Sequence, residues 1–262
     1  MKEKIKSIPI LNLDNYKNYY KINPSMPFLV KGYVKKWVAY KKWTFKFFIE
    51  QYPDLIVSIS SKKNGYKTFN CELEKFIKLI RKGDNEFDFT LHSWLFELNA
   101  PELCLDYKPD LVFENWFEDL PFYIKPKVKF IFIGSKNTGT TLHQDPINSS
   151  AWNALIKGQK KWYFFPPTQK IAKHYFEYET LIKQDFKKIK PLEIVQNQGD
   201  LVYIPPNWFH CVYNTENYIS LSENFMNETN YTNVLQYFKS FNQVGYISIL
   251  EKLIKEKTTY NI

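Results

Sequence analysis

The spacing of apolar residues changes character near residue 128 of this chain. Before that point, stretches with strand-like spacing alternate with stretches of helical spacing. Apolar residues recur at helical spacing within 72–80, which predicts an amphipathic helix. Thr44 is typical of an N-cap and Pro53 of a helix end, so another helix is predicted over 45–51. Short strands are predicted at 8–11, 27–32 and 55–59.

From residue 128 onward, short strands follow one another with turn residues between them. This pattern is typical of a barrel or sandwich built from two small sheets. Segments 150–156 and 160–165 flank a glycine-containing stretch, which predicts two strands of one hairpin. The fold class is therefore mainly β with flanking α-helices. We expect one domain over 1–226, with its core at about 128–226 and an amino-terminal elaboration of helices and strands.

The tail at 227–262 has a different pattern, because apolar residues recur there at helical spacing. Two helices are predicted within this carboxy-terminal segment. An apolar helical stripe usually packs on the core of its own chain.

Composition supports a packed interior, since 44% of the residues are hydrophobic and 18% are aromatic. Cys71, Cys104 and Cys211 have no paired spacing, which indicates neither a disulfide framework nor a thiolate zinc site. No run of 18 or more apolar residues occurs, so no membrane span is expected. We expect an intracellular protein, cytoplasmic or nuclear.

The formal net charge of +9 has two interpretations. Basic residues occur singly and in pairs, such as Lys35-Lys36 and Lys187-Lys188, and such charges usually form a solvated surface. The alternative is a basic surface that attracts an anionic substrate or partner, including nucleic acid.

One short motif carries candidate metal chemistry. His143 and Asp145 lie two positions apart after the apolar run at 130–133, and side chains two apart on a strand share a face. With His210 they make two imidazoles and one carboxylate, the ligand set of non-haem Fe(II) oxygenases. A histidine on a strand is more often structural than a ligand, so the motif alone leaves both interpretations open. His92 precedes a stretch at 93–98 interpreted as helical and is expected to be structural, and His174 is assigned no role.

Several stretches together resemble a known family. Segments 138–146 and 150–162 are similar to the core of the jumonji C (JmjC) branch of the cupin-like oxygenases that depend on Fe(II) and 2-oxoglutarate. Segments 199–210 and 222–225 are similar to its second half, and 27–44 to its entry segment. Among these enzymes the chain most resembles the small protein hydroxylases, such as the jumonji lysyl hydroxylase. The resemblance implies a double-stranded β-helix, the cupin-like jelly roll, with Fe(II) as cofactor and 2-oxoglutarate as cosubstrate.

The resemblance also implies roles for four cavity residues. Alternation alone leaves Lys160 equally able to face inward, or outward beside Lys161. The resemblance directs it inward, to pair with the distal carboxylate of 2-oxoglutarate, with a hydrogen bond from Thr140. Asn153 and Asn224 would line the cavity nearer the metal. Ser220 and Ser222 share the strand face of Asn224, which indicates either a ligand cavity or a solvated face.

The function expected from these features is hydroxylation of a protein side chain, with a protein or peptide as substrate. The alternatives are an oxygenase that acts on RNA, a demethylase of histone or arginine substrates, and a non-catalytic cupin-like binding protein. Resembling hydroxylases use carboxy-terminal helices as a dimer contact, so a homodimer is an open alternative for the tail. Glu114, Glu118 and Asp119 are the clustered acids nearest the motif in sequence, and only acids at the entrance would favour a basic tail.

Overall fold

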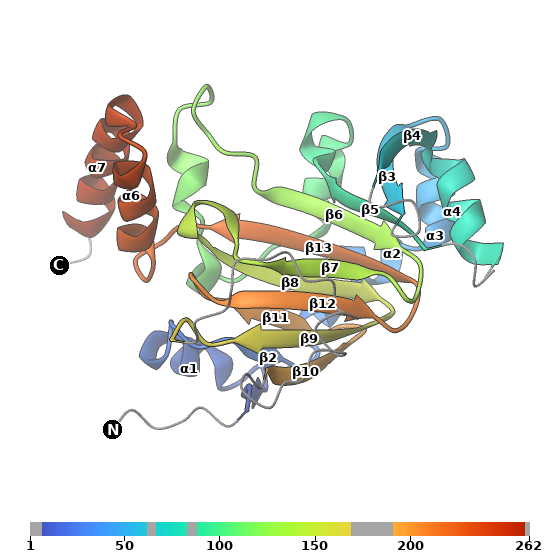
Figure 1. Cartoon of the computed structure of the whole chain (residues 1–262), viewed down its shortest axis with the longest axis horizontal. Helices are drawn as coiled ribbons and strands as arrows, with labels where there is room; N and C mark the ends of the chain where they lie inside the picture. Colours follow the sequence, from blue (N-terminus) through green and yellow to red (C-terminus); the bar gives the residue numbers. More distant parts are fainter. Residues whose placement is uncertain (1–6, 62–66, 83–87, 169–190, 260–262) are drawn as a thin grey trace.

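Two β-sheets lie face to face in the computed structural model, which describes residues 7–61, 67–82, 88–168 and 191–259 (Figure 1). His174 lies outside these residues. The larger sheet has the strand order β1-β2-β11-β8-β13-β6-β5-β3-β4, and the smaller sheet has the order β10-β9-β12-β7. This arrangement confirms the predicted jelly roll with flanking helices.

The larger sheet is formed by β1 (Ile10–Leu11), β2 (Phe28–Val30), β3 (Ile56–Ser61), β4 (Thr68–Glu72), β5 (Phe89–Trp94), β6 (Lys129–Gly134), β8 (Ser150–Lys157), β11 (Leu201–Ile204) and β13 (Tyr218–Phe225). The smaller sheet is formed by β7 (Gly139–His143), β9 (Gln159–Phe165), β10 (Leu192–Asn197) and β12 (Phe209–Asn214). The helices are α1 (Tyr16–Ile22), α2 (Val38–Lys42), α3 (Phe45–Gln51), α4 (Leu73–Lys82), α6 (Tyr231–Ser240) and α7 (Val244–Thr259).

The amino-terminal elements cover the face of the larger sheet that points away from the smaller one. Trp43 and Phe48, from the α2–α3 region, belong to the same buried cluster as Trp152 on β8 and Tyr203 on β11. Helix α3 begins as predicted, because the Thr44 side chain accepts a hydrogen bond from the Phe47 backbone N–H at 3.0 Å.

Alternation along β8 and β9 fills the space between the sheets. Ala151 from β8 packs there with Trp162 and Phe164 from β9 and with Val212 from β12. The intervening Trp152 points to the opposite face of the larger sheet. Polar side chains such as Asn153 and Lys160 lie between the sheets at a few positions beside this apolar layer.

The prediction that 150–156 and 160–165 form one hairpin is wrong. Strand β8 pairs with β11 and β13 in the larger sheet, whereas β9 pairs with β10 and β12 in the smaller one. Gly158 turns the chain from one sheet to the other with φ +92°, and a Cβ there would lie 2.5 Å from the Asn217 carbonyl oxygen. A tight glycine turn fits a hairpin and a crossing between packed sheets equally well, which is why the pattern misled.

The segment after His92 also differs from its prediction. Residues 89–94 form β5, and only Phe96–Leu98 is helical, as a 3₁₀ turn. Pairing of β5 with β6 shifts register between Leu91 and Trp94, where Ser93 takes a φ of +57°. This bulge interrupts the strict alternation that marks a strand, so the sequence pattern was ambiguous there.

The carboxy-terminal helices pack on the rest of the chain, as their apolar stripes indicate. Val234 and Phe238 of α6, and Leu250 of α7, join a buried cluster with Trp116. Lys257 forms ion pairs with Glu114 at 3.0 Å and Asp119 at 2.8 Å, and these contacts attach α7 to the stretch that precedes β6. The homodimer and the division at residue 226 stay predictions. Among the helices of the described ranges, none is long and apolar enough to cross a membrane.

A buried ionic group lies on the outer face of the larger sheet. Glu223 on β13 is 4% exposed and accepts a hydrogen bond from the Asn115 amide at 2.7 Å. Lys129 is close to it and forms ion pairs with Glu97 and Glu118, both at 3.0 Å. Burial raises the pKa of Glu223 to about 7, although Lys129 and Asn115 oppose the rise.

The raised pKa gives a prediction for stability. Between the ordinary pKa of a glutamate and about pH 7, Glu223 is protonated in the folded chain but ionised in the unfolded chain. The contribution of Glu223 to the free energy of unfolding therefore falls as pH rises through this range. The free energy of unfolding of the wild type, minus that of Glu223→Gln, should fall by on the order of 1–3 kcal/mol between pH 5 and pH 8. Urea unfolding at both pH values measures it. Glu193→Gln, at an exposed site, is the control, and a difference independent of pH would contradict the assignment.

Candidate functional site

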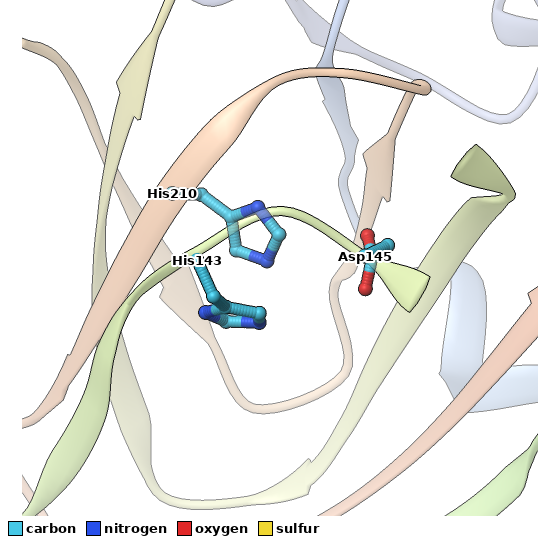
Figure 2. Close-up of side chains that lie close together, drawn as sticks. All are labelled: His143, Asp145 and His210. Atoms are coloured by element: carbon cyan, nitrogen blue, oxygen red, sulfur yellow. The ribbon is translucent and has the colours of Figure 1, made fainter. Parts of the chain in front are cut away.

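His143 and His210 face each other across two paired strands. Strand β7 runs antiparallel to β12, with His143 directly opposite His210, and the two ring centroids are 4.2 Å apart. Asp145 lies just beyond the end of β7, in extended backbone that leads into a short 3₁₀ turn. One ligand atom from each of the three residues lies within 4.8 Å of the others (Figure 2).

The three side chains meet as predicted, but the expected reason is only partly right. Strand β7 ends at His143, so Asp145 is not on the strand and its direction does not follow from alternation. The turn after it fixes the carboxylate instead. Ile147 and Asn148 both adopt left-handed backbone, with φ of 52° and 50°, which bends the chain sharply after Asp145.

Backbone carbonyls fix the orientation and the tautomer of both imidazoles. The Nδ1 of His143 lies 2.8 Å from the Thr141 carbonyl oxygen, and the Nδ1 of His210 lies 3.1 Å from that of Trp208. A carbonyl oxygen only accepts, so each Nδ1 must carry the proton and donate it. In the neutral form of each ring, Nε2 is then the unprotonated nitrogen, the atom that binds a metal in sites with such supporting contacts.

The charges of the site fit a divalent cation. The Oδ2 atom of Asp145 is buried and has no hydrogen-bond partner within the described part of the chain. Burial raises the pKa of Asp145, while His143 and Asn224 oppose the rise. Burial also lowers the pKa of His210 well below its usual range. A metal ion would supply the missing partner of the carboxylate and would bind the neutral imidazoles, so this ligand set fits Fe(II).

A cavity of about 830 Å³ extends from these residues into the space between the sheets. Thr140, Asn153, Lys160 and Asn224, the four residues assigned by resemblance, all line it. They come from β7, β8, β9 and β13, so both sheets contribute to its wall.

Lys160 faces inward and is 5% exposed. Within the described residues its ammonium has no carboxylate partner, and burial lowers its pKa to about 7. Lys161 points outward and forms an ion pair with Glu193 at 2.7 Å. The inward orientation of Lys160 is therefore confirmed, whereas its binding role stays a prediction.

Two further residues that line the cavity are His92, which sequence analysis did not assign to it, and Ser222, for which a cavity was one of two interpretations. His92 on β5 lines the cavity, and burial, together with the charges of Lys160 and His143, lowers its pKa to about 4. It was expected to be structural because the residues after it were interpreted as helical. Ser222 lines the cavity beside Asn224, as its strand face allowed, but Ser220 is fully buried outside the lining.

The fold and the ligand set together define a cupin-type protein with a candidate metal centre between its two sheets. Residues 17–234 match the family described as "Cupin-like domain". The chain therefore belongs to the cupin-like domain family, and the resemblance to its JmjC branch is confirmed by the relatives that follow.

Three curated relatives illustrate this membership. The chain is 26% identical over 243 residues to the lysine-specific demethylase JMJ21 of Arabidopsis thaliana, covering 84% of this chain and 25% of that protein. It is 25% identical to the bifunctional arginine demethylase and lysyl-hydroxylase psr-1 of Caenorhabditis elegans, over 79% of this chain and 57% of psr-1. It is 24% identical to the 2-oxoglutarate and iron-dependent oxygenase JMJD4 of Danio rerio, covering 82% and 58%. The chain thus spans less than two thirds of each relative.

The metal centre gives a prediction about binding. Replacing a ligand should weaken Fe(II) binding at least about 100-fold, because even the supporting contacts of ligands contribute about 10- to 100-fold. We expect this loss for His143→Ala and Asp145→Ala, with the folded structure retained, measured by anaerobic titration calorimetry and circular dichroism. His92→Gln is the control, since its ring is in the cavity but outside the ligand set. Undiminished Fe(II) binding in either ligand variant would reject the site.

Proposed function

We propose that this chain is an Fe(II)- and 2-oxoglutarate-dependent dioxygenase that hydroxylates a side chain of a protein substrate. One observation carries the proposal: three convergent candidate ligands line the same cavity as a buried ammonium that has no carboxylate partner among the described residues. A cation that is buried without a counter-charge is costly. An anionic ligand that also reaches the metal would offset that cost, and a keto diacid has this chemistry.

In the proposed complex, His143, Asp145 and His210 hold the metal and leave its other positions open. The keto acid end of 2-oxoglutarate would lie at the metal, and its distal carboxylate at Lys160 and Thr140. Lys160 lies opposite Asn214 in the β9–β12 pairing, and His210 lies four residues before Asn214. At about 3.3 Å per residue, the two ends of the site are about 13 Å apart along the strand.

The bound cofactor and cosubstrate would supply the oxidising step, in which dioxygen and 2-oxoglutarate give succinate and carbon dioxide while a substrate C–H bond becomes C–OH. The chain's own residues bind and orient. Asp145 would contribute a negative charge to the metal, and the carbonyls of Thr141 and Trp208 orient the rings of His143 and His210 by accepting from their Nδ1–H groups. Trp162, Phe164 and Ile204 help to exclude water from the space between the sheets.

A protein substrate is favoured by the relatives, whose names specify lysyl hydroxylation and arginine or lysine demethylation. Demethylation is the alternative outcome, because hydroxylation of an N-methyl group leads to its loss. Glu114, Glu118 and Asp119 do not favour basic tails at this site. They are absent from the cavity lining and pair with Lys125, Lys129 or Lys257.

An RNA substrate would be attracted through its phosphates by the net charge of +9. A non-catalytic binding protein would have no need of the complete ligand set.

Lys160 gives a prediction for cosubstrate affinity. Lys160→Ala should weaken 2-oxoglutarate binding by on the order of 1.5–3 kcal/mol, because a charge-assisted contact in a buried site is lost. Lys161→Ala should change it little, since that side chain is paired with Glu193 outside the cavity. Titration calorimetry on the Fe(II)-loaded protein without oxygen measures both. The larger loss at Lys161 would contradict the proposed role.

The same binding should depend on pH. Burial lowers the pKa of Lys160 to about 7, and a bound carboxylate would raise it again. Binding at pH 8 should therefore take up a proton, and affinity should fall as pH rises from about 7 to about 9. Calorimetry in buffers of different ionisation enthalpy measures the uptake. Uptake that persists in Lys160→Ala would assign it to another group.

The substrate prediction separates the candidate reactions. We expect folded proteins or peptides with acidic flanks to gain 16 Da, the mass of one oxygen atom, and methylated histone peptides to lose little methyl. Mass spectrometry after reaction with proteins, methylated peptides and RNA measures this. Efficient demethylation without addition of oxygen to any protein would reject the hydroxylase, and oxygen added only to RNA would favour the RNA alternative.

A further inference from the structure

The ammonium of Lys160 rests on an aromatic ring. Its Nζ lies 4.0 Å from the centroid of Tyr218, on the neighbouring sheet, and 6.0 Å from that of Phe132. The Tyr218 ring is 2% exposed, so water does not screen this contact. A cation over the face of a desolvated ring is stabilised by attraction to the electrons of that face. The ring stabilises the positive charge but does not neutralise it. A carboxylate in the same place would neutralise it.

Three adjacent strands hold the ring of Tyr218 in position. Tyr218 on β13 pairs with Gly134 on β6, and Gly134 pairs with Thr90 on β5. The Tyr218 side chain crosses over Gly134 and forms a 2.8 Å hydrogen bond with the Thr90 hydroxyl. A Cβ on Gly134 would lie 2.7 Å from the Tyr218 ring and 3.0 Å from the Thr90 oxygen. The absence of a side chain at 134 therefore lets the ring lie flat across β6.

We propose that Tyr218 is a positioning residue for Lys160: its ring, anchored at Thr90 over Gly134, supports one side of the ammonium and directs the charge into the cavity. This inference rests on the proposed function, because it assigns the ammonium to the distal carboxylate of 2-oxoglutarate. Tyr218 acts through Lys160 and needs no contact with the cosubstrate. A long, flexible lysine chain has many rotamers, and a support that selects one of them reduces the entropy lost on binding.

Two substitutions of Tyr218 distinguish the contribution of its aromatic ring from that of its hydroxyl group. Tyr218→Phe keeps the aromatic face and loses the bond to Thr90, whereas Tyr218→Met fills the space without an aromatic face. Anaerobic calorimetry of 2-oxoglutarate binding to the Fe(II)-loaded full chain should give about 10- to 30-fold weaker binding for Tyr218→Met and a change within about threefold for Tyr218→Phe. Fe(II) affinity should be unchanged in both. Tyr246→Leu, which removes a partly buried tyrosine of α7, is the control for general destabilisation.

A double-mutant cycle tests whether the effect passes through Lys160. In a Lys160→Met background, Tyr218→Met should change 2-oxoglutarate affinity by less than about threefold, because the charge that the ring supports is gone. Tyr218→Leu replaces Tyr218→Met in the cycle should the latter not fold. Wild-type affinity in the non-aromatic variants, or an equal loss in the Lys160→Met background, would overturn the inference. Failure of the wild-type protein itself to bind 2-oxoglutarate would instead reject the proposed function, and this inference with it.

Discussion

The antiparallel pairing of β7 with β12 is the contact on which the candidate site depends. It places His143 directly opposite His210, so one register brings together two ligands that lie 67 positions apart in the chain. The backbone carbonyls that fix both rings belong to the same pair of segments, two residues before each histidine. A slip of one residue would turn one ring to the other face and would separate it from its partner. Register here sets both the geometry of the site and the nitrogen that each imidazole turns toward it.

Local and repeated patterns were read correctly from the sequence. The Thr44 cap, the amphipathic helix at α4 and the apolar stripes of α6 and α7 depend on neighbours three or four residues away, and those are visible in one sequence. The ligand set was recognisable because its residue types are rare in combination. The inward direction of Lys160 was not decided by alternation, which allowed both faces, and the family resemblance supplied the missing information.

The failures have a common physical cause. A glycine turn after β8 looks the same whether the next strand pairs with β8 or crosses to the facing sheet, since that choice depends on packing between residues distant in sequence. The bulge at Ser93 hid the strand that carries His92, and the turn after Asp145 replaced the expected strand geometry. Tertiary contacts determine each of these features, and the local pattern records them only weakly.

Two lysines, Lys129 partly buried and Lys160 buried, have opposite surroundings. Lys129, on the outer face of the larger sheet, pairs with Glu97 and Glu118 beside Glu223, and its pKa is raised in consequence. Lys160, on the cavity side, has an aromatic ring in place of carboxylates, and its pKa is lowered. Within the described residues, carboxylates therefore neutralise the ammonium of Lys129 but not that of Lys160. A buried cation without a counter-charge lowers the stability of the fold, and the same desolvation strengthens its attraction for an anion that binds beside it. This contrast favours a ligand role for Lys160 over a structural one, because a structural lysine gains stability from partners of the kind that surround Lys129.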